Sequence, residues 1–176
     1  KTTKKQEELV EITAEECYRH DIPLFLEILT YSVNPNEKKL ASSEKCQVII
    51  DSIEKFTLLG VDLFKIEFPI NINEISDESA WENACKKVSN ITKVPWTLLS
   101  ANVDYETFAK QTEIACKAGA SGVIAGRAIW KEIINLEDEE KEIADEKEKI
   151  EDIKDKQSGV TTSIRTSGKA EKTVYD

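Results

Sequence analysis

The feature that most constrains the fold of this chain is a regular alternation of short apolar runs with longer amphipathic segments. Runs of four to eight apolar residues that each precede a helix of about 12 to 18 residues are typical of βα units, whose parallel strands are covered on both faces. We therefore expect an α/β fold with four parallel strands and five helices. The four apolar runs are "IPLFLEILTY", "VDLFKIEFPI", "VPWTLLSANV" and "SGVIAGRAIW".

Residues that begin and end helices support this division of the chain. Ser42 or Ser43 is placed to cap the helix that follows the first run, and Gly60 is placed to end it. Asp104 is a suitable cap for "YETFAKQTEIACKA", and Gly119 stands at the usual C-terminal position of that helix. The boundaries of two predicted βα units are therefore marked by local chemistry as well as by hydrophobicity.

Composition limits the compartments in which the protein is expected and the partners it can bind. The chain has 176 residues, is 40% hydrophobic and carries a net charge of −10, so non-specific binding to nucleic acid or to an anionic membrane is not expected. No leader pattern opens the sequence and no apolar run reaches the roughly 20 residues of a membrane span, which favours a cytoplasmic location. The four cysteines lack C-x-x-C spacing and are expected to be reduced thiols, and no cluster has metal-ligand spacing, so we expect no cofactor and no metal.

The composition changes only near the C-terminus. Residues 1–155 fit one α/β unit, whereas residues 156–176 are polar and lack periodicity, which is typical of a loosely ordered tail. The charged run "EDEEKEIADEKEKIEDIKDK" before this tail is expected to be a solvated helix.

One predicted strand carries charges where a doubly covered strand should be apolar. In "DLFKIEFP", Lys65 and Glu67 share one face, while Phe64, Ile66 and Phe68 share the other. A buried lysine must be paired or neutral, and desolvation lowers the pKa of a lysine toward the range in which its amine attacks carbonyl groups to form a Schiff base.

Two readings of Lys65 remain open at this point. It can be a nucleophile, or it can form a structural ion pair with Glu67 or with Glu27 of the preceding apolar run. Glu27 in turn can be the partner of a buried cation or a general acid/base. For Lys65 to react as an amine, Glu67 should be engaged elsewhere, for instance by another cation, because an adjacent carboxylate favours the ammonium form.

Further polar residues fall at the C-terminal ends of the last two predicted strands, where parallel α/β folds bind their ligands. Ser100 closes the third run. Gly126 and Arg127 lie between the fourth run and a helix, so they offer backbone N–H groups and a guanidinium to a phosphate or a similar anion. The alternative for Gly126 is that it allows a helix to pack closely on a strand.

The quoted segments resemble the class I tagatose-bisphosphate aldolase family, whose relatives include the sulfofructose-phosphate aldolases. The matching pieces are "LFLEILTY", "VDLFKIEFPI", "VPWTLLSANV" and "AGASGVIAGRAIW", in this order, over about residues 20–135. The resemblance implies a parallel (β/α) barrel of the TIM type, to which this chain supplies about strands five to eight and their helices. It also implies that no metal is needed.

The resemblance also implies an activity and a role for each candidate residue. The reaction would be reversible aldol cleavage of a phosphorylated ketose, such as tagatose or fructose 1,6-bisphosphate or sulfofructose 1-phosphate, to dihydroxyacetone phosphate and a three-carbon aldehyde. Lys65 would be the Schiff-base lysine and Glu27 the acid/base. Ser100, Gly126 and Arg127 would hold the substrate's phosphate or sulfonate group.

The chain departs from the family pattern in two respects. Where the family commonly has "SAGV", this sequence has "SANV", so Asn102 must adopt the turn that a glycine usually makes. The strands that would form the first half of the barrel have no counterpart. We expect a fragment of a longer protein; the alternatives are a half-barrel that pairs with itself or another chain, and a non-catalytic module that keeps an anion site. A deoxyribose-phosphate-type aldolase is a further alternative.

Overall fold

The computed structural model describes residues 2–36, 39–130 and 139–165 and contains one parallel four-stranded sheet. The strands are parallel, as the alternation predicts, and they pair in the order in which they occur in the sequence, β1-β2-β3-β4. Their bounds are β1 (Phe25–Ile28), β2 (Leu63–Ile66), β3 (Trp96–Leu99) and β4 (Gly122–Ile124). β1 and β4 are therefore the two edges of the sheet.

A helical segment follows each strand, and one precedes the first. The six described segments are α1 (Thr2–Arg19), α2 (Ser42–Thr57), α3 (Glu78–Ile91), α4 (Tyr105–Lys117), α5 (Arg127–Trp130) and α6 (Glu139–Arg165). The first four match the predicted helices, and residues 131–138 between α5 and α6 lie outside the described part. None of the described helices is long and apolar enough to cross a membrane.

The predicted helix boundaries hold with one exception. The Asp104 side chain accepts a hydrogen bond from the backbone N–H of Thr107 at 2.8 Å, and Gly60 and Gly119 both have positive φ. The predicted serine cap of α2 is wrong, because Ser42 is already helical and its N–H donates to Glu74 Oε2 at 2.8 Å. A carboxylate from the loop after β2 therefore caps α2.

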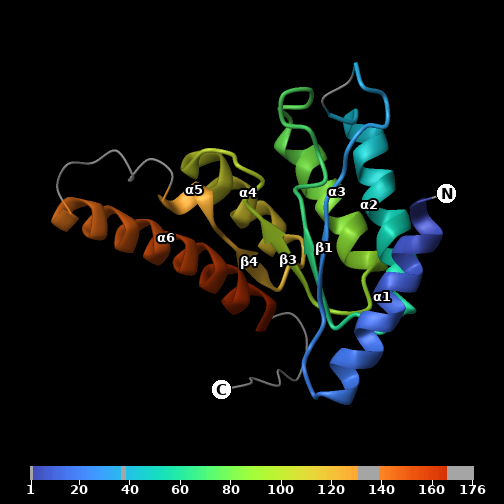
Figure 1. Ribbon diagram of the computed structural model, residues 1–176. Coiled ribbons are helices and arrows are strands. Elements are labelled where there is room, and N and C mark those ends of the chain that lie inside the picture. The colour runs from blue at the N-terminus through green and yellow to red at the C-terminus, as the bar shows by residue number, and fades with distance from the viewer. Residues whose placement is uncertain (1, 37–38, 131–138, 166–176) are drawn as a thin grey trace.

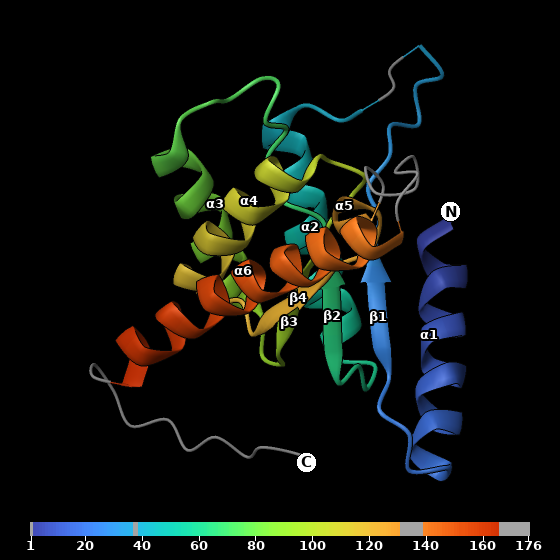
Figure 2. The ribbon, with the colours of Figure 1, turned by 90° about the vertical axis from the view of Figure 1, so that its left-hand side faces the viewer.

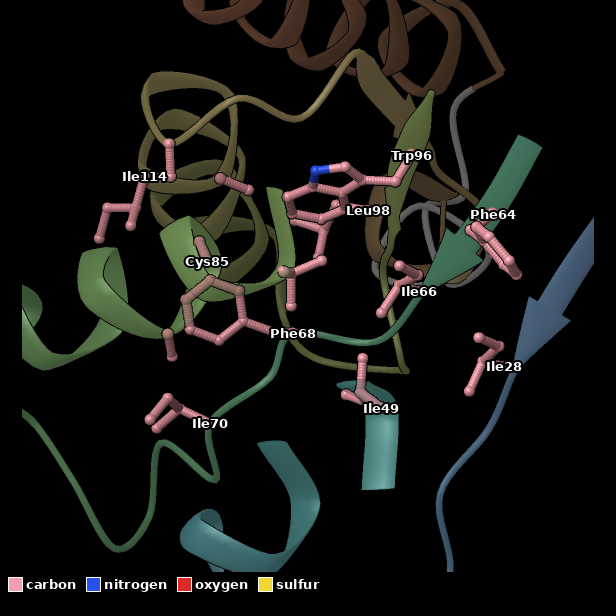
Figure 3. Packing of buried hydrophobic residues seen from close by; sticks show 14 of the residues in the cluster. Ile28, Ile49, Phe64, Ile66, Phe68, Ile70, Cys85, Trp96, Leu98 and Ile114 are labelled. Atoms are coloured by element: carbon pink, nitrogen blue, oxygen red, sulfur yellow. The ribbon is translucent and has the colours of Figure 1, made fainter. Parts of the chain in front are cut away.

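The apolar core lies between one face of the sheet and the helices α2, α3 and α4. Phe64, Ile66 and Leu98 are fully buried on this face, where Ile49 of α2 and Cys85 of α3 pack in the same cluster (Figure 3). The burial of Phe64 and Ile66 confirms the predicted alternation along β2. The opposite face of β2 carries the charged residues.

The long helix α6 lies on the other side of the sheet from α2. In Figure 1 the strands stand between α6 and α2, and after the 90° turn of Figure 2 α6 passes in front of the strands with α2 behind them. α6 packs on α4 and α5. It continues to Arg165, beyond residue 155 where the polar tail is expected, and residues 166–176 are not described, so that boundary stays a prediction.

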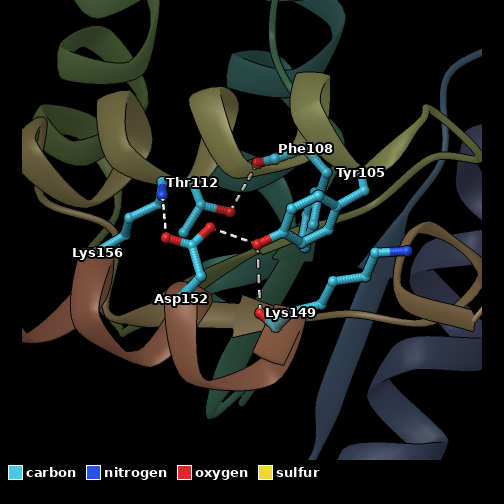
Figure 4. A network of polar contacts seen from close by, with 6 residues as sticks. All are labelled: Tyr105, Phe108, Thr112, Lys149, Asp152 and Lys156. Atoms are coloured by element: carbon cyan, nitrogen blue, oxygen red, sulfur yellow. Dashed lines mark hydrogen bonds and ion pairs between the residues drawn. The ribbon is translucent and has the colours of Figure 1, made fainter. Parts of the chain in front are cut away.

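A polar network fastens α6 to α4. The Tyr105 hydroxyl on α4 donates a hydrogen bond to the carboxylate of Asp152 on α6, which also pairs with Lys156 (Figure 4). Burial, and then the Asp152 carboxylate, raise the pKa of Tyr105. The Nζ atom of Lys149 lies 5.4 Å from the centre of the Tyr105 ring, a cation–π arrangement, and pairs with Asp145 at 2.8 Å. The charged segment is thus a docked helix with one side against α4.

Candidate functional site

The candidate site begins with two charged side chains on neighbouring strands. The parallel register pairs Glu27 of β1 with Lys65 of β2. Because side chains alternate between the two faces along a strand, both side chains lie on the face opposite the core. Lys65 Nζ donates a hydrogen bond to Glu27 Oε2 at 2.8 Å. Both remain reachable from solvent, because 26% of the Lys65 side chain and 42% of the Glu27 side chain are exposed.

The rest of the sheet offers Lys65 no further charge at the same level. Register places Thr97 of β3 beside Lys65, and Gly122 of β4 beside Thr97. Neither residue carries a charge, and Gly122 has no side chain. Glu27 is therefore the charged group that the strands themselves bring to Lys65 at this level.

Glu67, directly after β2, is engaged by other residues. Its Oε2 accepts hydrogen bonds from the backbone N–H and the hydroxyl of Thr30, each at 2.7 Å. Its Oε1 forms an ion pair with Lys45 Nζ at 3.8 Å. The requirement stated from the sequence, that another cation engage Glu67, is met in the structure.

Sequence reasoning missed both Thr30 and Lys45, although one signal for Lys45 was present. Lys45 lies one helical turn before Ile49 and two turns before Ile53, both of which are fully buried on α2. Residues four apart lie on the same side of a helix, so this stripe directs Lys45 toward the sheet. Its side chain is only 16% exposed, and burial lowers the pKa of Lys45 against the opposing effect of Glu67.

A tight turn of unusual backbone geometry follows β3. Ser100 is 8% exposed, and the next two residues, Ala101 and Asn102, have φ values of 46° and 61°. The backbone N–H of Val103 donates to the carbonyl of Ser100 at 3.1 Å and closes the turn. The left-handed conformation expected at Asn102 is confirmed, but Ala101 shares it, which no sequence pattern indicated. A left-handed alanine is strained by about 1 to 2 kcal/mol.

Gly126 and Arg127 lie at the junction of β4 and α5. The backbone N–H of Ile129 donates to the Gly126 carbonyl at 2.8 Å, and Arg127 is exposed. A Cβ added at Gly126 would meet no described heavy atom within 4 Å, so close packing of a helix on a strand does not explain this glycine. Within the described ranges, no hydrogen bond or ion pair joins Gly126, Arg127 or Ser100 to Lys65. They share the C-terminal edge of the sheet with it.

A pocket of about 120 Å³ opens at the same edge, beside Glu67. Thr30, Lys45 and Glu67 line one part of it, and Ala101 and Gln111 line another. The Gln111 side-chain oxygen is buried and has no hydrogen-bond partner among the described residues. Such an atom is costly to leave unsatisfied, so a polar donor that entered the pocket would be stabilised there. Within the described ranges, no group of three or more metal-ligating side chains was found.

Comparison with known proteins assigns the chain to a family. A family model described as "DeoC/LacD family aldolase" matches residues 1–132, which include β1 to β4 and all five candidate site residues. The chain belongs to the DeoC/LacD aldolase family. This confirms the resemblance inferred from the sequence segments. The helix α6 of this DeoC/LacD family member begins at Glu139, outside the matched residues.

Curated relatives of this DeoC/LacD chain are tagatose 1,6-diphosphate aldolases. The protein of Streptococcus mutans serotype c is 32% identical over 136 residues, which are 69% of this chain and 41% of that one. The protein of Enterococcus faecalis is 33% identical over 137 residues, 69% and 42%. The protein of Staphylococcus epidermidis is 32% identical over 150 residues, 77% and 46%. The chain thus spans less than half the length of these relatives.

A solved structure supports the fold. An archaeal fructose 1,6-bisphosphate aldolase matches with a TM-score of 0.50 and 24% identity, over 72% of this chain and 46% of that chain. At this level of identity the likeness concerns the fold alone. The parallel four-stranded α/β sheet of this DeoC/LacD chain is therefore similar to part of an aldolase fold.

Proposed function

We propose that this protein acts as a class I aldolase that cleaves a phosphorylated ketose to dihydroxyacetone phosphate and a three-carbon aldehyde. The single observation that carries the proposal is the contact between Lys65 Nζ and Glu27 Oε2 at 2.8 Å on the face of the sheet opposite the apolar core. An amine beside one carboxylate supplies a nucleophile together with a group that moves its protons. The relatives named tagatose 1,6-diphosphate aldolase support a ketose bisphosphate as the substrate class.

Lys65 is the nucleophile in this proposal. Its amine, after giving one proton to Glu27, attacks the ketone carbon, so that an N–C bond forms as the C=O π bond breaks. The alkoxide so formed takes a proton from the nitrogen to give a carbinolamine, whose hydroxyl then leaves as water with the proton that Glu27 returns, and an iminium ion remains. This cation is an electron sink for the bond that breaks in the next step.

Glu27 acts again when the carbon–carbon bond breaks. The bond between the α- and β-carbons of the iminium breaks, and its electrons form an enamine. At the same time Glu27 takes the proton of the hydroxyl on the β-carbon, which leaves as the aldehyde. Glu27 then protonates the enamine carbon, and water hydrolyses the imine to release the ketone product and free Lys65. Exposure of 42% of the Glu27 side chain leaves room for substrate beside it.

Ser100, Gly126 and Arg127 are proposed to hold the substrate's phosphate, or a sulfonate in its place. They follow β3, which pairs with β2, and β4, which pairs with β3, and they lie toward the same edge of the sheet as Lys65. Arg127 supplies a cation, and Gly126 leaves open space in which an anion can approach the backbone. The turn after Ser100 presents backbone groups at the adjacent strand end.

We further infer that the four strands are strands five to eight of a barrel whose remaining strands pair with the edges β1 and β4. The face that carries Lys65 also carries Phe25 and Leu29, which are 55% and 59% exposed although α6 lies on this side of the sheet, as expected for an interior surface whose opposite wall the described residues do not complete. On the outer side, Leu9 and Ile12 of α1 are 66% and 62% exposed. The opposite wall would come from a further part of the protein or from another chain.

Borohydride trapping tests the proposed chemistry. Incubation with dihydroxyacetone phosphate and borohydride should add the reduced product mass to Lys65, as located by peptide mass spectrometry. Lys65→Ala should abolish both the adduct and turnover. Lys86→Ala, which removes an exposed lysine of α3, is the matched control and should change neither.

Three results would count against the proposal. An adduct on another lysine, or none, would remove Lys65 from the reaction. Release of acetaldehyde from deoxyribose phosphate, without cleavage of any ketose phosphate, would replace the substrate class. Binding of phosphate at Arg127 with no turnover of either substrate would support a non-catalytic module instead.

A further inference from the structure

Glu67 is a second carboxylate close to Lys65 along the chain, and its position needs an explanation. It follows Lys65 by two residues, so the strand's alternation directs both side chains to the same side of the sheet. Its side chain is only 15% exposed. A buried carboxylate that was free to turn would be drawn to the nearest ammonium group and would stabilise that group's charged form.

In the structure, both carboxylate oxygens of Glu67 instead contact residues other than Lys65. Thr30, from the segment after β1, donates two hydrogen bonds to Oε2, one from its backbone N–H and one from its hydroxyl. Lys45, in the first turns of α2, lies 3.8 Å from Oε1. The ion pairs of the described residues join Glu67 to Lys45 and Lys65 to Glu27, not Lys65 to Glu67.

We propose that Thr30 and Lys45 are positioning residues that hold Glu67 away from Lys65 and balance its charge. Among the described residues, Lys65 is thereby left with Glu27 as its carboxylate partner. This inference rests on the proposed function in assigning the imine-forming role to Lys65. Its geometric part, the division of two lysines between two carboxylates, stands on the contacts alone.

The division matters for the proton that Lys65 must lose before it attacks a carbonyl. With one carboxylate beside it, the proton has one destination, Glu27, which is also the group that must return it when water leaves. With Glu67 unbalanced as well, two negative charges would favour the ammonium form, and a smaller fraction of Lys65 would be a free amine at neutral pH.

Among the described residues, one further cation acts on Lys45. Lys39, which lines the same pocket, adds positive charge near Lys45 and, after burial and against the effect of Glu67, lowers the pKa of Lys45. At the level of Lys65, β3 and β4 present Thr97 and Gly122, which are uncharged. Gln111, from α4, is also uncharged. Lys45 is therefore the cation that directly balances the negative charge of Glu67.

The test measures the reactivity of Lys65 without any substrate. Trace acetic anhydride labels free amines, and peptide mass spectrometry follows the labelling of Lys65 against pH, with exposed Lys86 as the internal reference. Lys45→Met keeps most of the side-chain stem but removes the charge. It should move the midpoint of Lys65 labelling to higher pH and lower its labelling at pH 8 about three- to tenfold, which equals a shift of about half to one pH unit.

Two further variants separate positioning from a merely structural role. Lys45→Arg keeps the charge and should label as the wild type does. The double variant Lys45→Met, Glu67→Gln removes the unbalanced carboxylate and should restore the wild-type midpoint. Thr30→Val removes the hydroxyl donor, keeps the N–H, and should shift the midpoint in the same direction by less.

The outcomes distinguish this inference from the proposed function. An unchanged midpoint in folded Lys45→Met or, where that variant does not fold, in Thr30→Val overturns the positioning role. A shifted midpoint that the double variant does not restore overturns it too. If the midpoints shift as expected but borohydride traps no adduct on Lys65, the positioning holds and the aldolase proposal fails.

Discussion

Replacing Glu27 by glutamine tests whether this residue moves protons or only pairs with a lysine. Glutamine has nearly the same size and can still accept a hydrogen bond from Lys65 Nζ, but it neither carries charge nor takes up a proton. The ion pair is partly exposed, at 26% and 42% of the two side chains. Pairs of this kind stabilise a fold by about 0 to 1 kcal/mol, so the free energy of unfolding of the variant should lie within about 1 kcal/mol of the wild-type value.

The expected effect on turnover is much larger. General acid/base groups contribute about 10²- to 10⁴-fold to a rate, which corresponds to about 3 to 5 kcal/mol of transition-state stabilisation. A stability change of under 1 kcal/mol leaves almost all molecules folded and cannot produce such a loss. The assay is steady-state cleavage of a ketose bisphosphate, coupled to reduction of dihydroxyacetone phosphate, with urea unfolding measured in parallel.

A matched control comes from an ion pair remote from the sheet edge. Glu82→Gln breaks the contact of Glu82 with Lys86 at 2.6 Å within α3 and should alter neither turnover nor stability by more than the error. Turnover of Glu27→Gln within threefold of wild type would refute the acid/base assignment. A loss of stability large enough to account for the lost turnover would show that Glu27 has a structural role only.

Three further predictions concern other parts of the described structure. Burial raises the pKa of Cys85 from 9.0 to about 12, so at pH 9 a thiol reagent should label Cys85 in the folded protein about 10³-fold more slowly than in urea; equal rates would contradict this. The stability that the protonated Cys85 thiol contributes below pH 9 should be lost as the pH rises toward 12. Tyr105→Phe should weaken the docking of α6 by about 1 kcal/mol and speed amide exchange in α6 but not in α3, whereas uniform exchange would rule out a local effect. Gly119→Ala should lower the melting temperature, because the φ of Gly119 is +111° and an added Cβ would lie 2.8 Å from Ser89 Oγ. Gly126→Ala is the control and should leave the melting temperature unchanged, since an added Cβ there meets nothing within 4 Å; equal shifts would contradict this interpretation of the two glycines.

Much of the fold could be predicted because its elements are encoded locally. Alternation along β2 separates Phe64 and Ile66 from Lys65, and caps such as Asp104 act within one turn of their helix. The cap of α2 could not be predicted, because it comes from Glu74, which is 32 residues away along the chain. Contacts of that separation depend on how elements dock and leave no periodic trace.

The same limit applies to the site. The sequence offered Lys65 two partners, Glu67 and Glu27, and only the register between β1 and β2 decides for Glu27. Thr30 was overlooked because it lies near the end of an apolar run without breaking any pattern. Lys45 was overlooked because a lysine on a helix is usually solvated, although its spacing from buried Ile49 indicated otherwise.

The order of the strands has a consequence for how the chain folds during synthesis. Within the described sheet, each strand ladder joins two strands that are consecutive in the sequence, so the partner of each new strand has already been made when that strand leaves the ribosome. Closing such a ladder requires only the loop that contains one helix, which keeps the entropic cost of each step low. The sheet can therefore grow by one βα unit at a time, and the contact between Glu27 and Lys65 can form as soon as the second strand has been made.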